Sequence, residues 1–197
     1  MNASQHSLSS AFQSSWTAQV LASPPMIAPA RQFVWPQHVP GEEDALARGA
    51  MLLNVKPVTG GNFLATCALG YRDPKLPSGV WTCPQPDDLL AVAGGYAYLV
   101  NTRQPEHCQF LPLRPVVEVL QVPDYKMLVL VGFHTVAAIG ERGWLWQTAK
   151  LSWEGVRLGD VSDGKLRGWG WDMRTDRELP FAIDLGTGEH TGGAFLR

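Results

Sequence analysis

Charge is scarce in this chain, and neither sign prevails. Charged residues make up 17% of the 197 positions, and 16 Lys and Arg nearly balance 18 Asp and Glu, so the formal net charge is −2. Such a chain has no basic field that could hold nucleic acid or an anionic membrane surface. It also has no apolar run long enough to span a bilayer. The sequence therefore predicts no nucleic-acid partner and no membrane binding.

Cysteine is also rare, with only Cys67, Cys83 and Cys108. An odd number without close pair spacing argues against a disulfide framework. We therefore predict buried or half-buried free thiols, because free Cys behaves as a small hydrophobe. The first residues lack the basic stretch and apolar core of a secretory signal. Together these features predict a soluble cytoplasmic protein.

Recognisable catalytic and metal-binding motifs are absent as well. The histidines are isolated at positions His6, His38, His107, His134 and His190. No two of them have metal-ligand spacing, and the acidic stretch 160–164 lacks the later ligands of a calcium loop. There is no Gly-x-Ser-x-Gly elbow and no phosphate-binding loop. The sequence predicts no metal and no cofactor.

Glycine and proline are abundant by contrast, with 20 and 15 residues. From residue 31 onward they separate short runs rich in β-branched and aromatic residues, which is typical of strands joined by tight turns. Only residues 42–48 have the pattern of a short helical turn in this part of the chain. These observations predict an all-β domain over residues 31–197.

A glycine followed by an aromatic residue, with Asn62 between them in the first instance, recurs at a nearly constant interval. The glycines Gly61, Gly95, Gly132 and Gly168 are separated by 34, 37 and 36 residues. A regular period of this size indicates one supersecondary unit used several times. We predict antiparallel meander repeats of about 36 residues, with each glycine between the first and second strands. Both a propeller-like arrangement and a β-sandwich fit this pattern.

Residues 1–30 form a segment of different composition, which we interpret as an N-terminal arm. It is rich in Ser, Ala, Gln and Pro and contains no charged residue. Residues 8–21 place Leu8, Phe12 and Trp16 four apart, which predicts one weak helix. The apolar anchors are expected to dock on the same chain or on a second subunit. The sequence favours a homodimer, the commonest assembly of soluble chains.

Nine apolar residues are predicted to form the core: Val92, Tyr98, Leu99, Leu128, Leu130, Val136, Ile139, Leu145 and Ile183. Their runs alternate with turn residues, and adjacent core residues require strands that are covered on both faces.

Tryptophan pairs are the main candidates for a binding site. Trp144 and Trp146 are two apart, as are Trp169 and Trp171, and residues i and i+2 share one face of a strand. Each pair could form a stacking platform for a ligand or could pack in the core, where Trp buries a large area. The glycines that alternate with the second pair, Gly168 and Gly170, favour close packing on the opposite face.

Two functions remain open at this level. The first is a non-catalytic binding or interaction module, with a protein or peptide partner docked on the tryptophans. The alternative is a hydrolase of a small or sugar substrate that uses His134 and a nearby acid as an acid–base pair.

Overall fold

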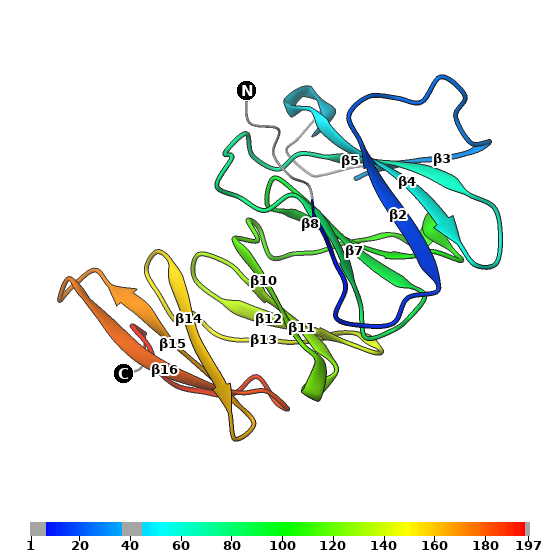
Figure 1. The fold of residues 1–197 in the computed structure, drawn as a ribbon. Coiled ribbons are helices and arrows are strands. Elements are labelled where there is room, and N and C mark those ends of the chain that lie inside the picture. The colour runs from blue at the N-terminus through cyan, green and yellow to red at the C-terminus, as the bar shows by residue number, and fades with distance from the viewer. Residues whose placement is uncertain (1–6, 37–44, 196–197) are drawn as a thin grey trace. The chain divides into compact units, whose positions relative to one another are not determined.

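A computed structural model describes residues 7–36 and 45–195, which form four β-sheets (Figure 1). The first sheet has the order β2 (Trp16–Leu21), β4 (Ala50–Pro57), β5 (Phe63–Ala68), β3 (Arg31–Trp35). The second has the order β1 (Ser7–Ser9), β6 (Gly79–Thr82), β7 (Asp88–Ala93), β8 (Tyr96–Asn101), β9 (Gln109–Phe110). Among the described strands, parallel pairs occur only at one edge of each of these two sheets, where β3 joins β5 and β1 joins β6.

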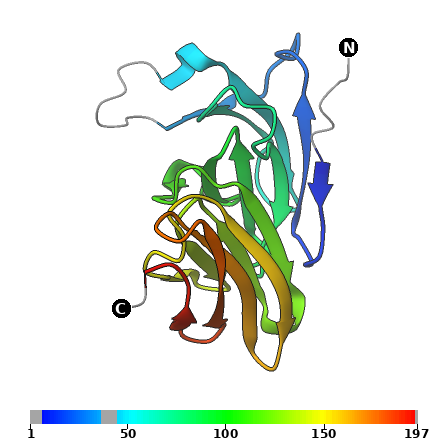
Figure 2. The same cartoon turned by 90° about the vertical axis from the view of Figure 1, so that its left-hand side faces the viewer.

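The third and fourth sheets are antiparallel meanders in chain order (Figure 2). The third contains β10 (Glu118–Val122), β11 (Met127–Val131), β12 (Val136–Gly140), β13 (Gly143–Gln147). The fourth contains β14 (Val156–Ser162), β15 (Lys165–Asp172), β16 (Arg177–Asp184), β17 (His190–Gly192). The predicted all-β fold built from antiparallel meanders is confirmed.

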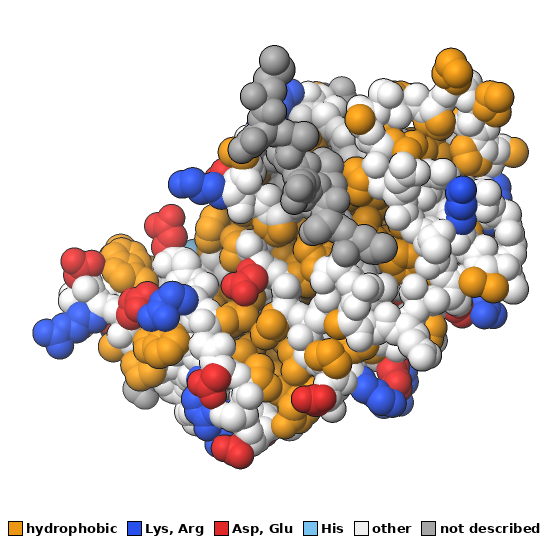
Figure 3. Space-filling model, viewed as in Figure 1, with side chains coloured by type: hydrophobic (Ala, Val, Ile, Leu, Met, Phe, Trp, Pro, Cys, Tyr) orange, Lys and Arg blue, Asp and Glu red, His pale blue; other side chains and the backbone are white. Residues whose placement is uncertain are grey.

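Helix in the described residues is confined to three short 3-10 turns: Ala45–Arg48, Pro105–His107 and Pro123–Tyr125. The first lies in the predicted turn 42–48, of which residues 42–44 fall outside the described part. None of these helices is long and apolar enough to cross a membrane. On the face drawn in Figure 3, acidic and basic side chains are interspersed, as the near balance of charge implies.

The predicted helix over residues 8–21 is wrong, because this segment contributes two strands. β1 pairs with β6 of the second sheet, whereas β2 pairs with β4 of the first. Between them, the Phe12 amide donates to the Thr82 hydroxyl at 3.1 Å, and the Ser15 hydroxyl donates to the Asp87 carboxylate. The described arm residues therefore dock on their own chain.

The placement predicted for the repeated glycines is also wrong. Gly61, Gly95 and Gly132 lie in turns between two inner strands of their sheets, and Gly168 lies within β15. The corresponding turn of the fourth sheet is at residues 173–176, between β15 and β16. Gly95 does require glycine, because its φ is +82° and an added Cβ would lie 2.7 Å from Pro115. The interval of about 36 residues thus reflects a repeated β-sheet, although Gly168 lies within a strand and not in the corresponding turn.

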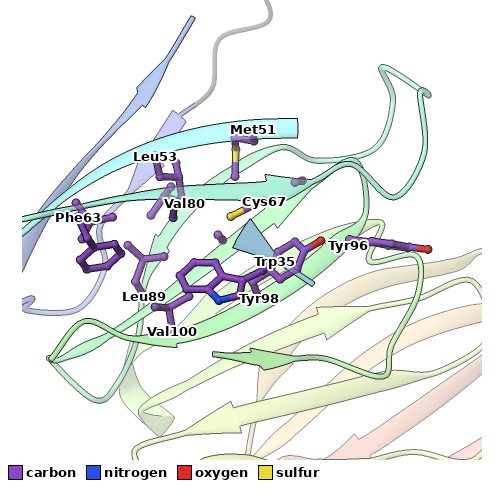
Figure 4. Packing of buried hydrophobic residues seen from close by; sticks show 14 of the residues in the cluster. Trp35, Met51, Leu53, Phe63, Cys67, Val80, Leu89, Tyr96, Tyr98 and Val100 are labelled. Carbon is purple, nitrogen blue, oxygen red and sulfur yellow. The ribbon is translucent and has the colours of Figure 1, made fainter. Parts of the chain in front are cut away.

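The chain divides into two compact units, residues 1–116 and residues 117–197. In the first unit, the first and second sheets enclose a core in which Leu53, Phe63 and Cys67 meet Leu89 and Tyr98 (Figure 4). The described part of the predicted arm belongs to this unit through β1 and β2. The division into an arm and a single domain from residue 31 stays a prediction.

In the second unit, the third and fourth sheets share a core of their own. Val129, Val131 and Ala138 of the third sheet pack with Leu166 and Ile183 of the fourth. Eight of the nine predicted core residues are buried, and Leu145 is the exception at 45% exposure. Paired sheets with a shared core are common to propellers and sandwiches, the two arrangements that the sequence favours.

All three cysteines are free thiols, as predicted. Cys67 and Cys83 are buried and Cys108 is half-buried. Burial raises the pKa of the Cys67 and Cys83 thiols well above their usual value and that of Cys108 to about 12.

We expect the native thiols to alkylate about a thousandfold more slowly than a free cysteine, whose pKa is about 8.5. The reason is that the thiolate is the reactive form, and burial suppresses it at Cys108. Timed iodoacetamide treatment at pH 8 followed by mass spectrometry measures the rate. Unfolded protein should take up three labels, and rapid labelling of native Cys108 would contradict the expectation.

Candidate binding surface

The outer face of the fourth sheet carries two tryptophans of strand β15, Trp169 and Trp171. Along β15, the residues Leu166, Gly168, Gly170 and Asp172 are buried, and the alternating residues Arg167, Trp169 and Trp171 are half-buried. This period of two is what a strand with one covered face requires. Trp169 and Trp171 therefore share the face that points away from the core of the unit.

Close packing behind β15 explains why glycine alternates with tryptophan. A Cβ added to Gly168 would lie 2.5 Å from the Arg157 carbonyl oxygen, and one added to Gly170 would lie 2.1 Å from that of Leu151. Neither position can hold even a methyl group. Between Arg167 and Trp171, the large side chains of the strand are consequently all on its outer side.

Trp169 is fixed between its neighbours on the two flanking strands. It pairs with Arg157 on β14 and with Pro180 on β16. The Arg157 guanidinium lies over the indole, 4.1 Å from the ring centroid, in a cation–π contact. Arg157 and Pro180 are exposed, so the Trp169 ring lies in a surface row of three side chains.

Arg157 is in turn held by Glu178. Its Nη2 donates to the carboxylate at 2.5 Å and its Nε at 3.2 Å, which makes the pair bidentate. Hydrogen bonding within this pair raises the pKa of Arg157 and lowers that of Glu178. Both side chains are about half exposed, so the pair orients the guanidinium more than it stabilises the fold.

Trp171 lies beside the turn between β15 and β16. Its Nε1–H donates to the Asp176 carboxylate at 3.0 Å. The neighbouring Asp172 carboxylate is 2% exposed and accepts from the Thr175 hydroxyl and from the Arg174 amide and guanidinium. Burial opposes ionisation of Asp172, but these hydrogen bonds outweigh it and lower its pKa. Hydrogen bonds from its own side chains therefore fix the conformation of this turn.

The other tryptophan pair does not form a shared stripe. A β-bulge shifts the register between Ala138 and Ile139, so that Ala138 faces Trp146 and Ile139 faces Trp144. The extra residue is Leu145, which explains its exposure. Trp146 and Trp144 consequently point to opposite faces of the sheet.

Trp146 belongs to the core of the second unit. It is 8% exposed, and its Nε1–H donates to the Leu185 carbonyl at 2.9 Å. The ring packs on the backbone of Gly188, where an added Cβ would come within 2.6 Å. Trp144 is half-buried, and a ligand-binding role for it stays a prediction.

His134 is exposed and lies before β12, next to Phe133. Its Nδ1 is 3.2 Å from the Ser152 carbonyl oxygen. Within the described ranges, the ring forms no hydrogen bond or ion pair with a carboxylate. The acid–base pair suggested by the sequence thus has no observed partner, and a catalytic His134 stays a prediction. Among residues 7–36 and 45–195, no group of three His, Cys, Asp or Glu side chains could hold a metal ion.

Arg157, Glu178 and Pro180 are surface residues that sequence reasoning missed. They are 12, 9 and 11 positions from Trp169 and match no motif. Only the strand register brings them beside the indole. An alternation of exposed charged residues with buried apolar ones along β14 and β16 could have indicated their face.

No family model and no curated protein matches the sequence. Two solved structures are similar in fold. One is the N-terminal domain of Nup159, at 14% identity and a TM-score of 0.37, covering 96% of this chain and 53% of that one. The other is an S. cerevisiae complex of Dbp5 bound to Nup159, Gle1, IP6 and ADP, at 11% identity and a TM-score of 0.39, with coverages of 95% and 54%. The chain spans about half the length of each, and TM-scores this low carry no argument about function.

Proposed function

We propose that the chain is a non-catalytic binding module that docks a protein or peptide on the outer face of its fourth sheet. The observation that carries the proposal is the Trp169 indole, fixed by Arg157 on a face that is uncovered within its own unit. A large side chain that is already oriented loses little conformational freedom on binding. Trp and Arg are also the residues that most often dominate binding energy at protein interfaces.

The chemistry of this face favours a peptide over a sugar or a nucleic acid. Arg157 and Glu178 are hydrogen-bonded to each other, so the indole and Pro180 remain as the main contact surface. An apolar or proline side chain of an extended segment can stack on such a surface. The balanced net charge of −2 provides no attraction for a polyanion.

Affinity capture with the full chain, followed by calorimetry with the captured protein, tests this proposal. Trp169→Ala should weaken that binding about tenfold or more, the effect of losing a central aromatic anchor. Trp144→Ala is the comparison variant, because Trp144 is also half-buried but lies on the third sheet, so a site on the fourth sheet predicts little effect from it. Equal affinities of wild type and Trp169→Ala, with unchanged melting temperatures, would refute the assignment of this face.

The hydrolase alternative is not proposed, because no observation favours it over the binding module. His134 contacts a backbone carbonyl, which orients the ring without supplying an acid partner. We infer the cytoplasm as the location of the protein, since three unpaired thiols suit a reducing compartment.

A further inference from the structure

An apolar loop projects from the first sheet between β2 and β3. Residues 22–30 contain three prolines and no charge. Met26 and Ile27 at its tip are 104% and 90% exposed, the highest values among the large apolar side chains of the described residues. Figure 1 shows the loop in blue beyond the ends of the strands, and Figure 3 shows apolar side chains gathered in that region. Two adjacent apolar side chains held this far from the core have no role in folding the unit.

A hollow of about 430 Å³ lies between the same loop and the neighbouring strands. Its walls are Pro25, Ile27, Ala28, Pro29 and Ala30, and the remaining lining residues are Asn54 of β4 and Asn62 before β5. Neither asparagine amide is hydrogen-bonded to another group in the described part of the chain. The hollow therefore combines apolar walls with two amides that are available to a neighbouring backbone.

We propose that a second copy of the chain docks here, with the Met26 side chain at the loop tip of each copy entering the hollow of the other. A projection and a hollow on one surface are what a two-fold symmetric interface needs, since the same patch must complement itself. The occupant of the hollow should be uncharged, apolar and rich in free carbonyl groups. Loop 22–30 meets these requirements, because its prolines have no N–H and its side chains carry no charge.

The size of the surface sets the expected strength of this dimer. A stable interface buries about 800 Å² on each partner, which is more than a nine-residue loop and its base can supply. The prolines restrict the loop before binding, so the ordering cost is small. We therefore expect a weak dimer with a dissociation constant in the micromolar range. This interface is on the first sheet and does not depend on the function proposed for the fourth.

Sedimentation equilibrium of the full chain over about 1 µM to 1 mM measures the association. Wild type should shift from monomer to dimer, and the double substitution Met26→Ser, Ile27→Ser should weaken the dimer at least tenfold. Val58→Ser is the matched control, because Val58 is an exposed apolar residue at 77% in the neighbouring β4–β5 turn. A wild type that remains monomeric at the highest concentration would overturn the proposal. So would a dimer that survives the double substitution.

A charge-complementation experiment separates the proposed contact from a general loss of solubility or folding. Met26→Asp and Asn62→Lys should each weaken self-association, because each introduces a charge opposite an uncharged group. An equimolar mixture should form a heterodimer at least tenfold tighter than either homodimer, since one Asp then meets one Lys. Failure of the mixture to associate, with both variants folded by circular dichroism, would overturn the pairing. Binding of the loop to neutral phospholipid vesicles in place of a second copy would do the same.

Discussion

Gly170→Ala is expected to lower the free energy of unfolding of the second unit by about 3 kcal/mol, at the upper end of overpacking effects. The added methyl carbon would lie 2.1 Å from the Leu151 carbonyl oxygen and 3.2 Å from the Ser152 Cβ. Leu151 cannot withdraw easily, because its amide donates to the His134 carbonyl and its own carbonyl accepts from Ala194. Relief of the clash therefore requires the loss of backbone hydrogen bonds.

Urea unfolding followed by tryptophan fluorescence measures this effect, since several tryptophans lie in the second unit. Gly61→Ala is the control, because its added Cβ has no neighbour closer than 3.6 Å and its φ is not in the left-handed region. That variant should stay within about 0.5 kcal/mol of wild type. Equal stabilities of the two alanine variants would show that the space behind β15 is less restricted than described.

Trp16→Ala is expected to cost about 3–5 kcal/mol in the first unit, as for other large aromatic residues removed from a core. Trp16 is 3% exposed and packs in the core between the first and second sheets. Its Nε1–H also donates to the Asp88 carbonyl of β7 at 3.0 Å, so the residue links β2 to the other sheet. Its loss leaves a cavity and removes the hydrogen bond that this carbonyl accepts from the indole.

Thermal and urea unfolding separates the loss of packing from the loss of the hydrogen bond. The variants to compare are Trp16→Ala, Trp16→Phe and Thr17→Ala. Trp16→Phe retains most of the packing but loses the hydrogen bond, so it should cost about 1 kcal/mol from that bond in addition to the smaller ring. Thr17 is exposed on the same strand, and its alanine variant should be nearly neutral. If Trp16→Ala were as stable as Thr17→Ala, β2 would not be part of the cooperative core.

The strands and the repeat were predictable because they depend on local patterns. Val92, Leu130 and Ile139 lie in short β-branched or apolar runs between turn residues, and all three are buried. The close packing of Gly168 and Gly170 also followed from the sequence, since a strand that alternates glycine with tryptophan has room on one face only. These features need no knowledge of which strands pair.

The features that depend on pairing were not predictable. The bulge opposite Ala138 and Ile139 turns Trp144 and Trp146 to opposite faces of the sheet. No residue type in this segment indicates a bulge. The strand β2 was mistaken for a helix because Phe12 and Trp16 are four apart, whereas their partners in the structure, Thr82 and Pro57, are distant in sequence. The position of Arg157 on the candidate surface also depends on strand pairing, because its register places it opposite Trp169.

The alternation of glycine and tryptophan on β15 has a consequence for how this sheet can assemble. A slip of one residue would turn every side chain of the strand to the opposite face. The indoles of Trp169 and Trp171 would then point at the Arg157 and Leu151 carbonyls, where even a methyl group does not fit. In many strands, small differences in hydrophobic contact determine the register. In β15, steric clashes of the indoles with the backbone prevent a register shift of one residue. The fourth sheet can therefore tolerate wide variation in its exposed residues without losing its register.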